Sequence, residues 1–384
     1  MSIEHELRGL RAPDEPAAQE RAWEVVRDAR RDLSGARRGH RSRRVLVAPI
    51  VVALVAALAL SPAGATVTRL IHQALTPRPA AAPFALPAPG TLLLSGAGGT
   101  WTVRADGSVR RLGPFTAASW SPHGIYIAAA STRTLAAIAP TGKAAWQLAI
   151  VNARDPRWFS PSGYRIAYLA GASVRVVAGD GSGDALLAHG AAAVAPAWRP
   201  QHQYQLAYAT ERGRVVVLDA TTGATLWSAR PRAGTTLALG WTAGGTALVV
   251  LGRRGLREYR PGGDLRTSVG FPAAAPVLAG SLSPAGDALA LQRGGIGSRL
   301  QVLSLSGSVH SPRTVLSGVA IRQIAWSPDG RWLLATAPTA DEWLFVRVAG
   351  VARILATARV AERFGRKAAP SVDGWCCALA AGGH

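Results

Sequence analysis

The fold of this chain is indicated by the stretch Trp326-Ser327-Pro328-Asp329-Gly330, which runs into the apolar segment Trp332–Ala335. Pro and Gly favour a tight turn, and the apolar segment has the length and composition of a short strand. Weaker copies of this turn-and-strand unit recur along most of the sequence. They open with Trp120, Phe159, Trp198, Trp241 and Leu282, and four of them carry a proline, at Pro122, Pro161, Pro200 and Pro284.

The copies follow one another at a nearly constant distance. The residue before the proline position falls at 121, 160, 199, 242, 283 and 327, so the steps are 39, 39, 43, 41 and 44 residues. A degenerate seventh copy is predicted at Ser371–Gly374, before the run Trp375–Leu379. Periods of this size are typical of solenoids, propellers or repeat arrays. The apolar runs lack helical periodicity, so the repeating unit is predicted to consist of strands.

Each unit also contains a second turn centred on glycine, which tolerates the positive φ of two-residue hairpins. These turns contain Gly107, Gly142, Gly181, Gly223, Gly263, Gly307 and Gly350. Two hairpins per unit make a four-stranded sheet, and about 295 residues divided by a period of about 41 give seven units. The sequence therefore predicts an all-β fold over residues 90–384, a seven-bladed β-propeller of four-stranded antiparallel blades. The first strands of the propeller are expected to share a blade with the last strands of the chain, which closes the ring and removes two open sheet edges. Thr91–Leu94 and Trp375–Leu379 could both fill the same strand position in that blade.

The repeat series resembles the WD40-like repeats of the TolB family of propellers, whose blades carry a W-S-P-D-G turn. The resemblance covers residues 90–384, and only Trp326–Gly330 is a complete copy. The position of Asp329 holds His, Ser, Gln, Gly or Ala in the other copies. The aromatic residue that opens a copy is predicted to pack between blades. The resemblance implies the fold and no ligand, because propellers have many functions.

Residues 1–44 are charged and rich in arginine. A helix is predicted from Glu15 to Leu33, because Asp14 can cap it and most of the following residues favour a helix. Trp23, Val26 and Leu33 lie near one face of this helix. Two interpretations stay open, since so short a helix with few apolar residues is marginally stable alone. It is either a solvated helix beside a membrane or a helix that binds a cytoplasmic partner through these three residues.

Residues 45–68 form an uncharged, mostly apolar run of 24 residues. This length is enough for a helix to cross a membrane, so a single transmembrane helix is predicted. Arginine is more frequent before the run than after it, which places the N-terminus in the cytoplasm. A signal peptide cleaved near Ala63–Ala65 is the alternative; it is disfavoured because the preceding charged region is too long. Residues 69–89 are rich in Pro and Ala and are predicted to form an extended linker.

The chain carries a net charge of +21, almost all of it from arginine. A surface of this kind outside the membrane would meet anionic lipid head groups or anionic wall polymers rather than nucleic acid. An arginine-rich composition of the whole genome would also explain it. The basic groups in the propeller are Arg230 and Arg232; Arg253, Arg254, Arg257 and Arg260; and Arg363, Arg366 and Lys367.

No catalytic, cofactor or metal motif is found, so an enzyme is not expected. The sequence lacks a G-x-S-x-G motif and a Walker lysine, and its histidines are scattered. Asp180–Asp184 begins like a calcium loop, but Ala191 stands where the bidentate acid belongs, which favours a hairpin turn. The adjacent Cys376 and Cys377 are predicted to be unbridged apolar strand residues, because neighbouring cysteines seldom fit disulfide geometry.

Three functional hypotheses follow. The first is a single-pass membrane protein whose extracytoplasmic propeller is a non-enzymatic binding or scaffold module at the cell envelope, for a protein or an anionic polymer. The second is a transmembrane regulator, similar in layout to membrane anti-sigma factors, whose Glu15–Leu33 helix binds a cytoplasmic factor; this segment contains no cysteine, unlike a zinc-binding group of those factors. The third, an enzyme acting on glycans or peptides, is disfavoured by the missing catalytic residues.

Overall fold

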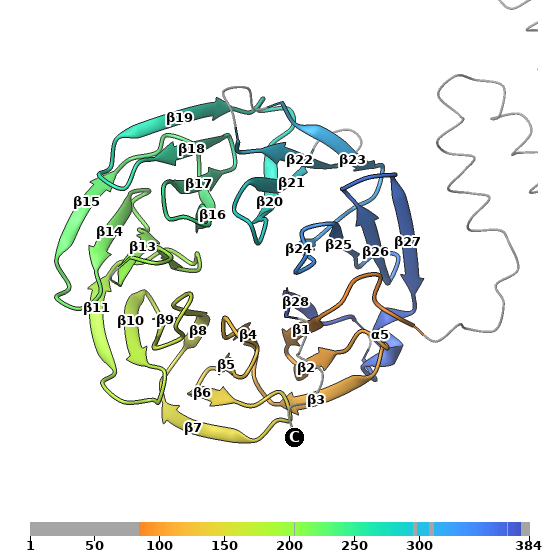
Figure 1. Cartoon of the computed structure of the whole chain (residues 1–384), viewed down its shortest axis with the longest axis horizontal. Helices are drawn as coiled ribbons and strands as arrows, with labels where there is room; N and C mark the ends of the chain where they lie inside the picture. The colour runs from red at the N-terminus through yellow and green to blue at the C-terminus, as the bar shows by residue number, and fades with distance from the viewer. Residues whose placement is uncertain (1–83, 203, 295–297, 307–310, 367, 378–384) are drawn as a thin grey trace, which may run out of the picture. The chain divides into compact units, whose positions relative to one another are not determined.

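The propeller is the part of the chain that the computed structural model describes. The described residues are 84–377, except 203, 295–297, 307–310 and 367. They form seven four-stranded antiparallel sheets arranged around a central axis (Figure 1). The prediction of an all-β, seven-bladed propeller is therefore confirmed.

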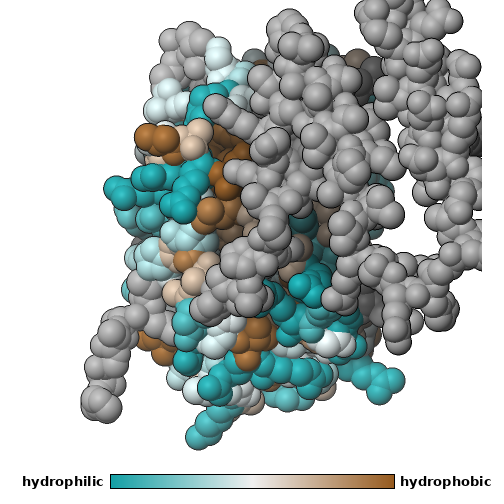
Figure 2. Space-filling model, turned by 90° about the vertical axis from the view of Figure 1, so that its right-hand side faces the viewer, coloured by the Kyte–Doolittle hydropathy of each residue, from teal (hydrophilic) through white to brown (hydrophobic). Residues whose placement is uncertain are grey.

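The predicted N-terminal helix, the predicted span 45–68 and the linker up to residue 83 lie outside the described residues. Within the described propeller, no helix is long and apolar enough to cross a membrane. On the side of the ring near β27, hydrophilic side chains cover much of the described surface, with hydrophobic ones between them (Figure 2).

Six blades are built from consecutive strands, and the first blade combines both ends of the propeller sequence. Blade 1 consists of β28 (Ser371–Cys376), β1 (Thr91–Gly96), β2 (Gly99–Val103) and β3 (Val109–Gly113). Blade 2 consists of β4 (Ala117–Trp120), β5 (Ile127–Ala130), β6 (Thr134–Ile138) and β7 (Ala144–Ala149). Blade 3 consists of β8 (Ala153–Trp158), β9 (Arg165–Ala170), β10 (Ser173–Ala178) and β11 (Ala185–His189).

The remaining blades repeat the same order from the inside of the ring outwards. Blade 4 consists of β12 (Ala197–Trp198), β13 (Gln205–Ala209), β14 (Val215–Asp219) and β15 (Thr225–Ala229). Blade 5 consists of β16 (Thr236–Trp241), β17 (Leu248–Gly252), β18 (Gly255–Tyr259) and β19 (Leu265–Gly270). Blade 6 consists of β20 (Val277–Leu282), β21 (Ala288–Arg293), β22 (Arg299–Ser304) and β23 (Arg313–Ser317). Blade 7 consists of β24 (Gln323–Trp326), β25 (Trp332–Ala337), β26 (Glu342–Arg347) and β27 (Arg353–Ala358), and the short helix α5 (Val360–Arg363) follows it.

The ring closes because the last strand joins the first blade. β28 pairs with β1, with Leu92 opposite Trp375 and Leu94 opposite Val372. Both terminal segments thus belong to one blade, β28 in the innermost position and β1 in the second, so neither excludes the other. The predicted turn at Ser371–Gly374 is wrong: these residues lie inside β28. In this blade the two inner strands come from opposite ends of the propeller sequence, so no turn has to join them.

The core lies between the blades. The second strand of each blade is buried on both faces, as in β5, β17 and β25, whose residues are all buried. Most residues of the outermost strands are exposed or half-buried, as in β7 and β27. This pattern explains the continuous apolar runs in the sequence, because a strand covered by a blade on each side needs apolar residues at every position.

The tryptophans that open the repeats connect the inner strands of adjacent blades. The buried indole of Trp326 donates a 2.8 Å hydrogen bond to the carbonyl oxygen of Ser281, and Trp241 donates one of 3.3 Å to Ala197. Trp198 donates a 2.8 Å bond to the carbonyl oxygen of Arg157. These three indoles therefore link neighbouring blades. Trp120, in contrast, is half-buried, and its indole nitrogen has no partner among the described residues.

In blade 3 the hydrogen bond to the preceding blade comes from Trp158, a residue that the repeat spacing does not select. A bulge in β8 between Arg154 and Arg157 shifts the register of the strand. Trp158 therefore donates the bond to the preceding blade, 3.3 Å from the carbonyl oxygen of Ser119. Phe159, which the repeat spacing selects, packs edge-on against Trp198 with ring centroids 5.4 Å apart.

The W-S-P-D-G turn is held by its own side chains. The Ser327 hydroxyl accepts a 2.9 Å hydrogen bond from the backbone N–H of Trp332 and donates one of 2.5 Å to Asp329. Gly330 adopts φ 66° and donates its N–H to the carbonyl oxygen of Ser327 at 2.9 Å. Asp329 and Gly330 therefore have a structural role.

The same hydroxyl bond occurs in copies that lack the aspartate. The hydroxyls of Ser121, Thr242 and Ser283 each accept a 3.0 Å bond from a backbone N–H of the following segment. A hydroxyl is thus sufficient to fix the turn, which explains why the Asp329 position varies between repeats.

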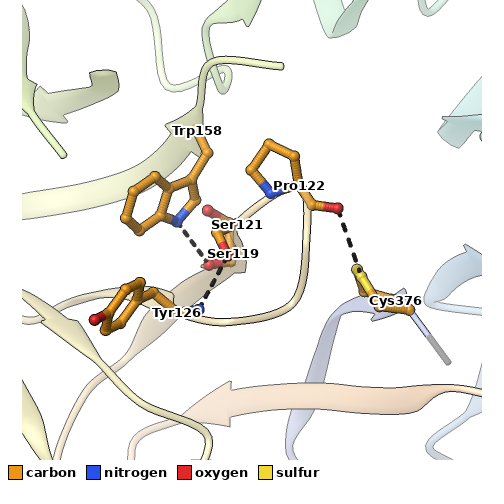
Figure 3. Close-up of a disulfide and its surroundings, with 7 residues drawn as sticks. Ser119, Ser121, Pro122, Tyr126, Trp158 and Cys376 are labelled. Atoms are coloured by element: carbon orange, nitrogen blue, oxygen red, sulfur yellow. Dashed lines mark hydrogen bonds between the residues drawn. A yellow bond between two sulfur atoms is a disulfide. The ribbon is translucent and has the colours of Figure 1, made fainter. Parts of the chain in front are cut away.

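The prediction for the two cysteines is wrong. Cys376 and Cys377 form a disulfide with each other, although they are adjacent. Cys376 ends β28, and Cys377 adopts φ 43°, in the left-handed region. The Sγ atom of Cys377 lies 3.8 Å from the carbonyl oxygen of Pro122, so the disulfide sits beside the first turn of blade 2 (Figure 3).

Candidate binding groove between blades 2 and 3

A groove of about 730 Å³ lies between blades 2 and 3. Its walls come from the turns that join the first and second strands of both blades, from β7, and from the turn between β10 and β11. All of these segments lie at the same end of the strands, because alternate hairpin connections of an antiparallel sheet lie at opposite ends. A volume of this size is typical of ligand sites and of sites for a few side chains of a partner.

Large apolar side chains at the rim of the groove are exposed to solvent. Ile125 is 60% exposed, Tyr126 is 41% exposed and Tyr164 is 69% exposed. Half-buried Trp146 and buried Trp158 line the same groove, and Trp158 lies beside the turn that carries Tyr126 (Figure 3). Tyr and Trp are among the residues that contribute most to binding energy at protein interfaces.

The rim residues are held by the repeat turns. The backbone N–H of Tyr126 donates a 3.0 Å hydrogen bond to the Ser121 hydroxyl, which leaves the phenol ring pointing out of the turn (Figure 3). The indole of Trp146 donates a 2.7 Å bond to the carbonyl oxygen of Gly179 in the next blade. Trp146 therefore fixes the distance between the two walls of the groove.

The exposed apolar residues occupy a repeat position where blades 5, 6 and 7 carry polar residues, whereas blade 4 carries Tyr204, which packs against Phe159. Ile125 and Tyr164 directly follow the turn glycines Gly124 and Gly163. The residues that follow the turn glycine in blades 5, 6 and 7 are Thr246, Asp287 and Arg331. Packing of the blades does not require a large apolar residue at this exposed position. This contrast between aligned repeats is the sequence signal that could have identified the groove.

The groove carries little charge. Asp180 is its only carboxylate among the described lining residues, and no arginine or lysine lines it. Hydrogen bonds from the Ser182 hydroxyl and backbone N–H lower the pKa of Asp180, which keeps this carboxylate ionised. The apolar, nearly neutral walls contrast with the basic character of the whole chain.

The Asp180–Asp184 segment is the predicted hairpin turn. Gly181 adopts φ 88°, and Asp180 accepts a 2.9 Å bond from the backbone N–H of Ser182. The carboxylate of Asp184 binds Arg175 and the hydroxyl of Tyr168, each at 2.6 Å. The Asp184 carboxylate is therefore already occupied by these two partners. Burial of Tyr168, together with the hydrogen bond to Asp184, raises the pKa of the Tyr168 hydroxyl. Among the described residues, no three His, Cys, Asp or Glu side chains are grouped to hold a metal ion.

The structure distributes the residues of the repeat motif around the ring and does not gather them in one site. Only Pro122 lines the groove, whereas Pro161 and Pro284 are exposed turn residues. The groove itself was missed from the sequence. The predicted partner-binding residues Trp23, Val26 and Leu33 lie outside the described residues.

Comparison with known proteins supports the fold. No protein-family model and no curated protein matches this chain. Similar solved structures include a chain of the mitotic checkpoint complex, with 18% identity, a TM-score of 0.54, and coverage of 68% of this chain and 94% of that chain. The β-propeller domain of Cps50 (Swd1) from Myceliophteria thermophila has 16% identity, a TM-score of 0.51, and coverage of 63% of this chain and 85% of that domain.

A candidate 6-phosphogluconolactonase from Bacteroides uniformis is also similar, with 14% identity, a TM-score of 0.53, and coverage of 71% of this chain and 97% of that chain. At these identities the similarity establishes the β-propeller fold and leaves the function open.

Proposed function

We propose that this chain is a non-enzymatic binding module that holds an apolar, extended segment of a protein partner in the groove between blades 2 and 3. The observation that carries the proposal is the exposure of Ile125, Tyr126 and Tyr164 at the rim of one groove. Burying such side chains is favourable by about 25 cal/mol per Å² of apolar area removed from water. A neutral, apolar partner segment fits, because the walls offer ring faces and almost no charge.

The test is a pair of substitutions that give the groove the polar character of blades 5, 6 and 7 at this position. Ile125→Ser and Tyr164→Ser are combined in the full-length chain, and capture of proteins from host membranes is quantified against the unchanged chain. Val351→Ser is the matched control, because Val351 is 80% exposed and does not line the groove. Loss of one captured protein with the groove pair alone supports the proposal. Equal capture by all three chains, or equal loss with Val351→Ser, contradicts it.

The proposal includes a membrane anchor, residues 45–68, and a propeller outside the cytoplasm. The uncharged run and the arginines before it support this arrangement. Protease added to intact cells stripped of their outer layers should degrade the propeller and leave residues 1–44 protected. Protection of the propeller until the membrane is opened would place it in the cytoplasm.

A transmembrane regulator is the second candidate. The placement of Trp23, Val26 and Leu33 on one face of the predicted helix favours it. Residues 1–44 are then expected to capture one cytoplasmic protein in stoichiometric amount, and Trp23→Ala should abolish the capture. If nothing specific is captured, the N-terminal segment has no regulatory partner and the groove remains the binding site.

A further inference from the structure

A second pocket, of about 550 Å³, lies at the opposite end of the strands from the groove. It is formed by the loop between β15 and β16, the turn between β17 and β18, and the loop between β19 and β20. Arg232, Arg253 and Arg254 line it, and none of the described lining residues is acidic. The structure thus brings together members of two of the basic groups seen in the sequence.

The turn that carries Arg253 and Arg254 is fixed from both sides by its main chain. Arg254 donates its N–H to the carbonyl oxygen of Ala233 at 2.8 Å, and Arg253 donates to that of Thr235 at 3.0 Å. On the other side, Phe271 and Val277 donate their N–H groups to the carbonyl oxygens of Arg254 and Arg253, at 2.8 and 2.9 Å. The pocket is therefore a preformed part of the fold, and its arginine side chains are not needed to build it.

Two further arginines hold the pocket walls and add positive charge behind them. A nitrogen of Arg257 lies 3.4 Å from the carbonyl oxygen of Arg232, to which it donates. Arg293 is buried, stacks on the ring of Phe271 at 4.5 Å, and donates a 2.7 Å bond to the carbonyl oxygen of Ala275. Burial, together with the nearby charge of Arg299, lowers the pKa of Arg293. Positive charge is thus concentrated around the pocket.

The three lining arginines have no acidic partner within the described chain. The described ion pairs involve other arginines, namely Arg154, Arg175 and Arg266. The remaining basic groups are used differently: Arg366 donates a 2.7 Å bond to the carbonyl oxygen of Gly98, and Arg363 stacks on Phe84. The guanidinium groups of Arg232, Arg253 and Arg254 are therefore exposed and available to an anion.

We propose that this arginine pocket binds a soluble ligand that carries two or three linked phosphate groups. Guanidinium groups bind phosphate oxygens in pairs, so three of them suit more than one phosphate. The volume is that of a small-molecule site and exceeds what a single ion fills. The pocket is recessed, so a small ligand can enter it. The flat surface of a bilayer fits such a pocket less well. This inference is independent of the groove between blades 2 and 3.

The experiment is a calorimetric titration of the purified full-length chain with inorganic triphosphate. The double variant Arg253→Ala/Arg254→Ala keeps the main-chain bonds of the turn. It should weaken binding by at least about tenfold, because each charge-assisted pair contributes that much. Arg133→Ala is the matched control, since Arg133 is also exposed, follows the second strand of its blade, and lies in blade 2. Its affinity should stay within about twofold of the unchanged chain.

Three results would overturn the inference. One is the absence of triphosphate binding, and another is equal weakening by Arg133→Ala. The third is citrate binding as tight as that of triphosphate, because this would show attraction by net charge alone. Vesicles of anionic phospholipid form a separate arm: binding to vesicles without binding to triphosphate would assign the pocket to a membrane surface instead. If the alanine pair does not fold, Arg253→Gln/Arg254→Gln provides the same comparison.

Discussion

The groove between blades 2 and 3 and the arginine pocket beside blade 5 lie at opposite ends of the same kind of blade. The groove is lined by Tyr, Trp and Ile and has one carboxylate, whereas the pocket is lined by three arginines and has none. Both are formed by residues in turns and loops, which the packing of the blades leaves free to vary. The comparison shows how one repeated scaffold can present two unrelated binding chemistries, one at each end of its strands.

The largest expected effect comes from a substitution in the scaffold that both sites share. Trp326→Ala removes a buried indole and its bond to Ser281, and should lower the free energy of unfolding by about 3–5 kcal/mol. Denaturant unfolding measures this loss. Near the unfolding midpoint, partner capture and triphosphate binding should be lost together, since both need the closed ring. Loss of only one of them would show that the blades fold independently.

A pH effect of a few kcal/mol is expected from Asp373, which lies in β28 far along the sequence from both sites. Burial is the main cause that raises the pKa of its carboxyl from 3.8 to about 7. The folded state therefore holds more protons than the unfolded state between these values. Stability should fall as the pH rises from about 4 to about 7 and level off above, at about 1.4 kcal/mol per pKa unit.

Asp373→Asn provides the control for this pH effect. Asparagine does not titrate, so the slope between about pH 4 and pH 7 should be much smaller, and the variant should be the more stable chain at about pH 8. Thermal unfolding across this range measures both chains. An unchanged slope in the variant would assign the pH dependence to other groups.

A smaller effect, confined to the groove, is expected from Trp146→Phe. Phenylalanine keeps a ring in the groove wall and loses the 2.7 Å bond to Gly179, so stability should drop by about 1 kcal/mol. Partner capture should weaken, and triphosphate binding should not change. A change in triphosphate affinity would mean that the two ends of the propeller are coupled.

The smallest effect is expected from Asp329→Ala, which should cost less than about 1 kcal/mol, because the Ser327 hydroxyl still holds the turn. Ser327→Ala is its reference and should cost about 1–3 kcal/mol, since it leaves the buried N–H of Trp332 without a partner. Unfolding curves of both variants decide the order. A larger loss with Asp329→Ala would show that the carboxylate, rather than the hydroxyl, fixes the turn.

The blade number and the turns could be predicted because they depend on local chemistry. Proline, glycine and a Ser or Thr hydroxyl, in varying combinations, mark most of the turns within a few residues, and the spacing of these residues counts the blades. Closure of the ring by strands from both ends could also be predicted, and the structure confirms it. The innermost position of β28 could not be predicted, because its pairing with β1 joins segments that are far apart in the sequence. The bulge in β8, after which Trp158 instead of Phe159 bonds to the preceding blade, could not be predicted either, because the repeat spacing does not reveal a local register shift.

The groove was missed for a different reason: its residues are unremarkable one at a time. Ile125 and Tyr164 become informative only when aligned with Thr246, Asp287 and Arg331 of other repeats. The arginine pocket was visible in part, as basic groups in the sequence. In the pocket, the loop before blade 5, which carries Arg232, meets the Arg253–Arg254 turn and the loop after blade 5. The repeat spacing alone does not show that these segments lie side by side.

The central claim is that the two ends of the propeller bind different partners independently. The most direct test measures both partner capture and triphosphate affinity in Ile125→Ser/Tyr164→Ser and in Arg253→Ala/Arg254→Ala. Each pair should weaken binding at its own end by at least about tenfold and leave the other end unchanged. The account is contradicted if one variant pair loses both binding activities. It is also contradicted if both variant pairs keep both activities.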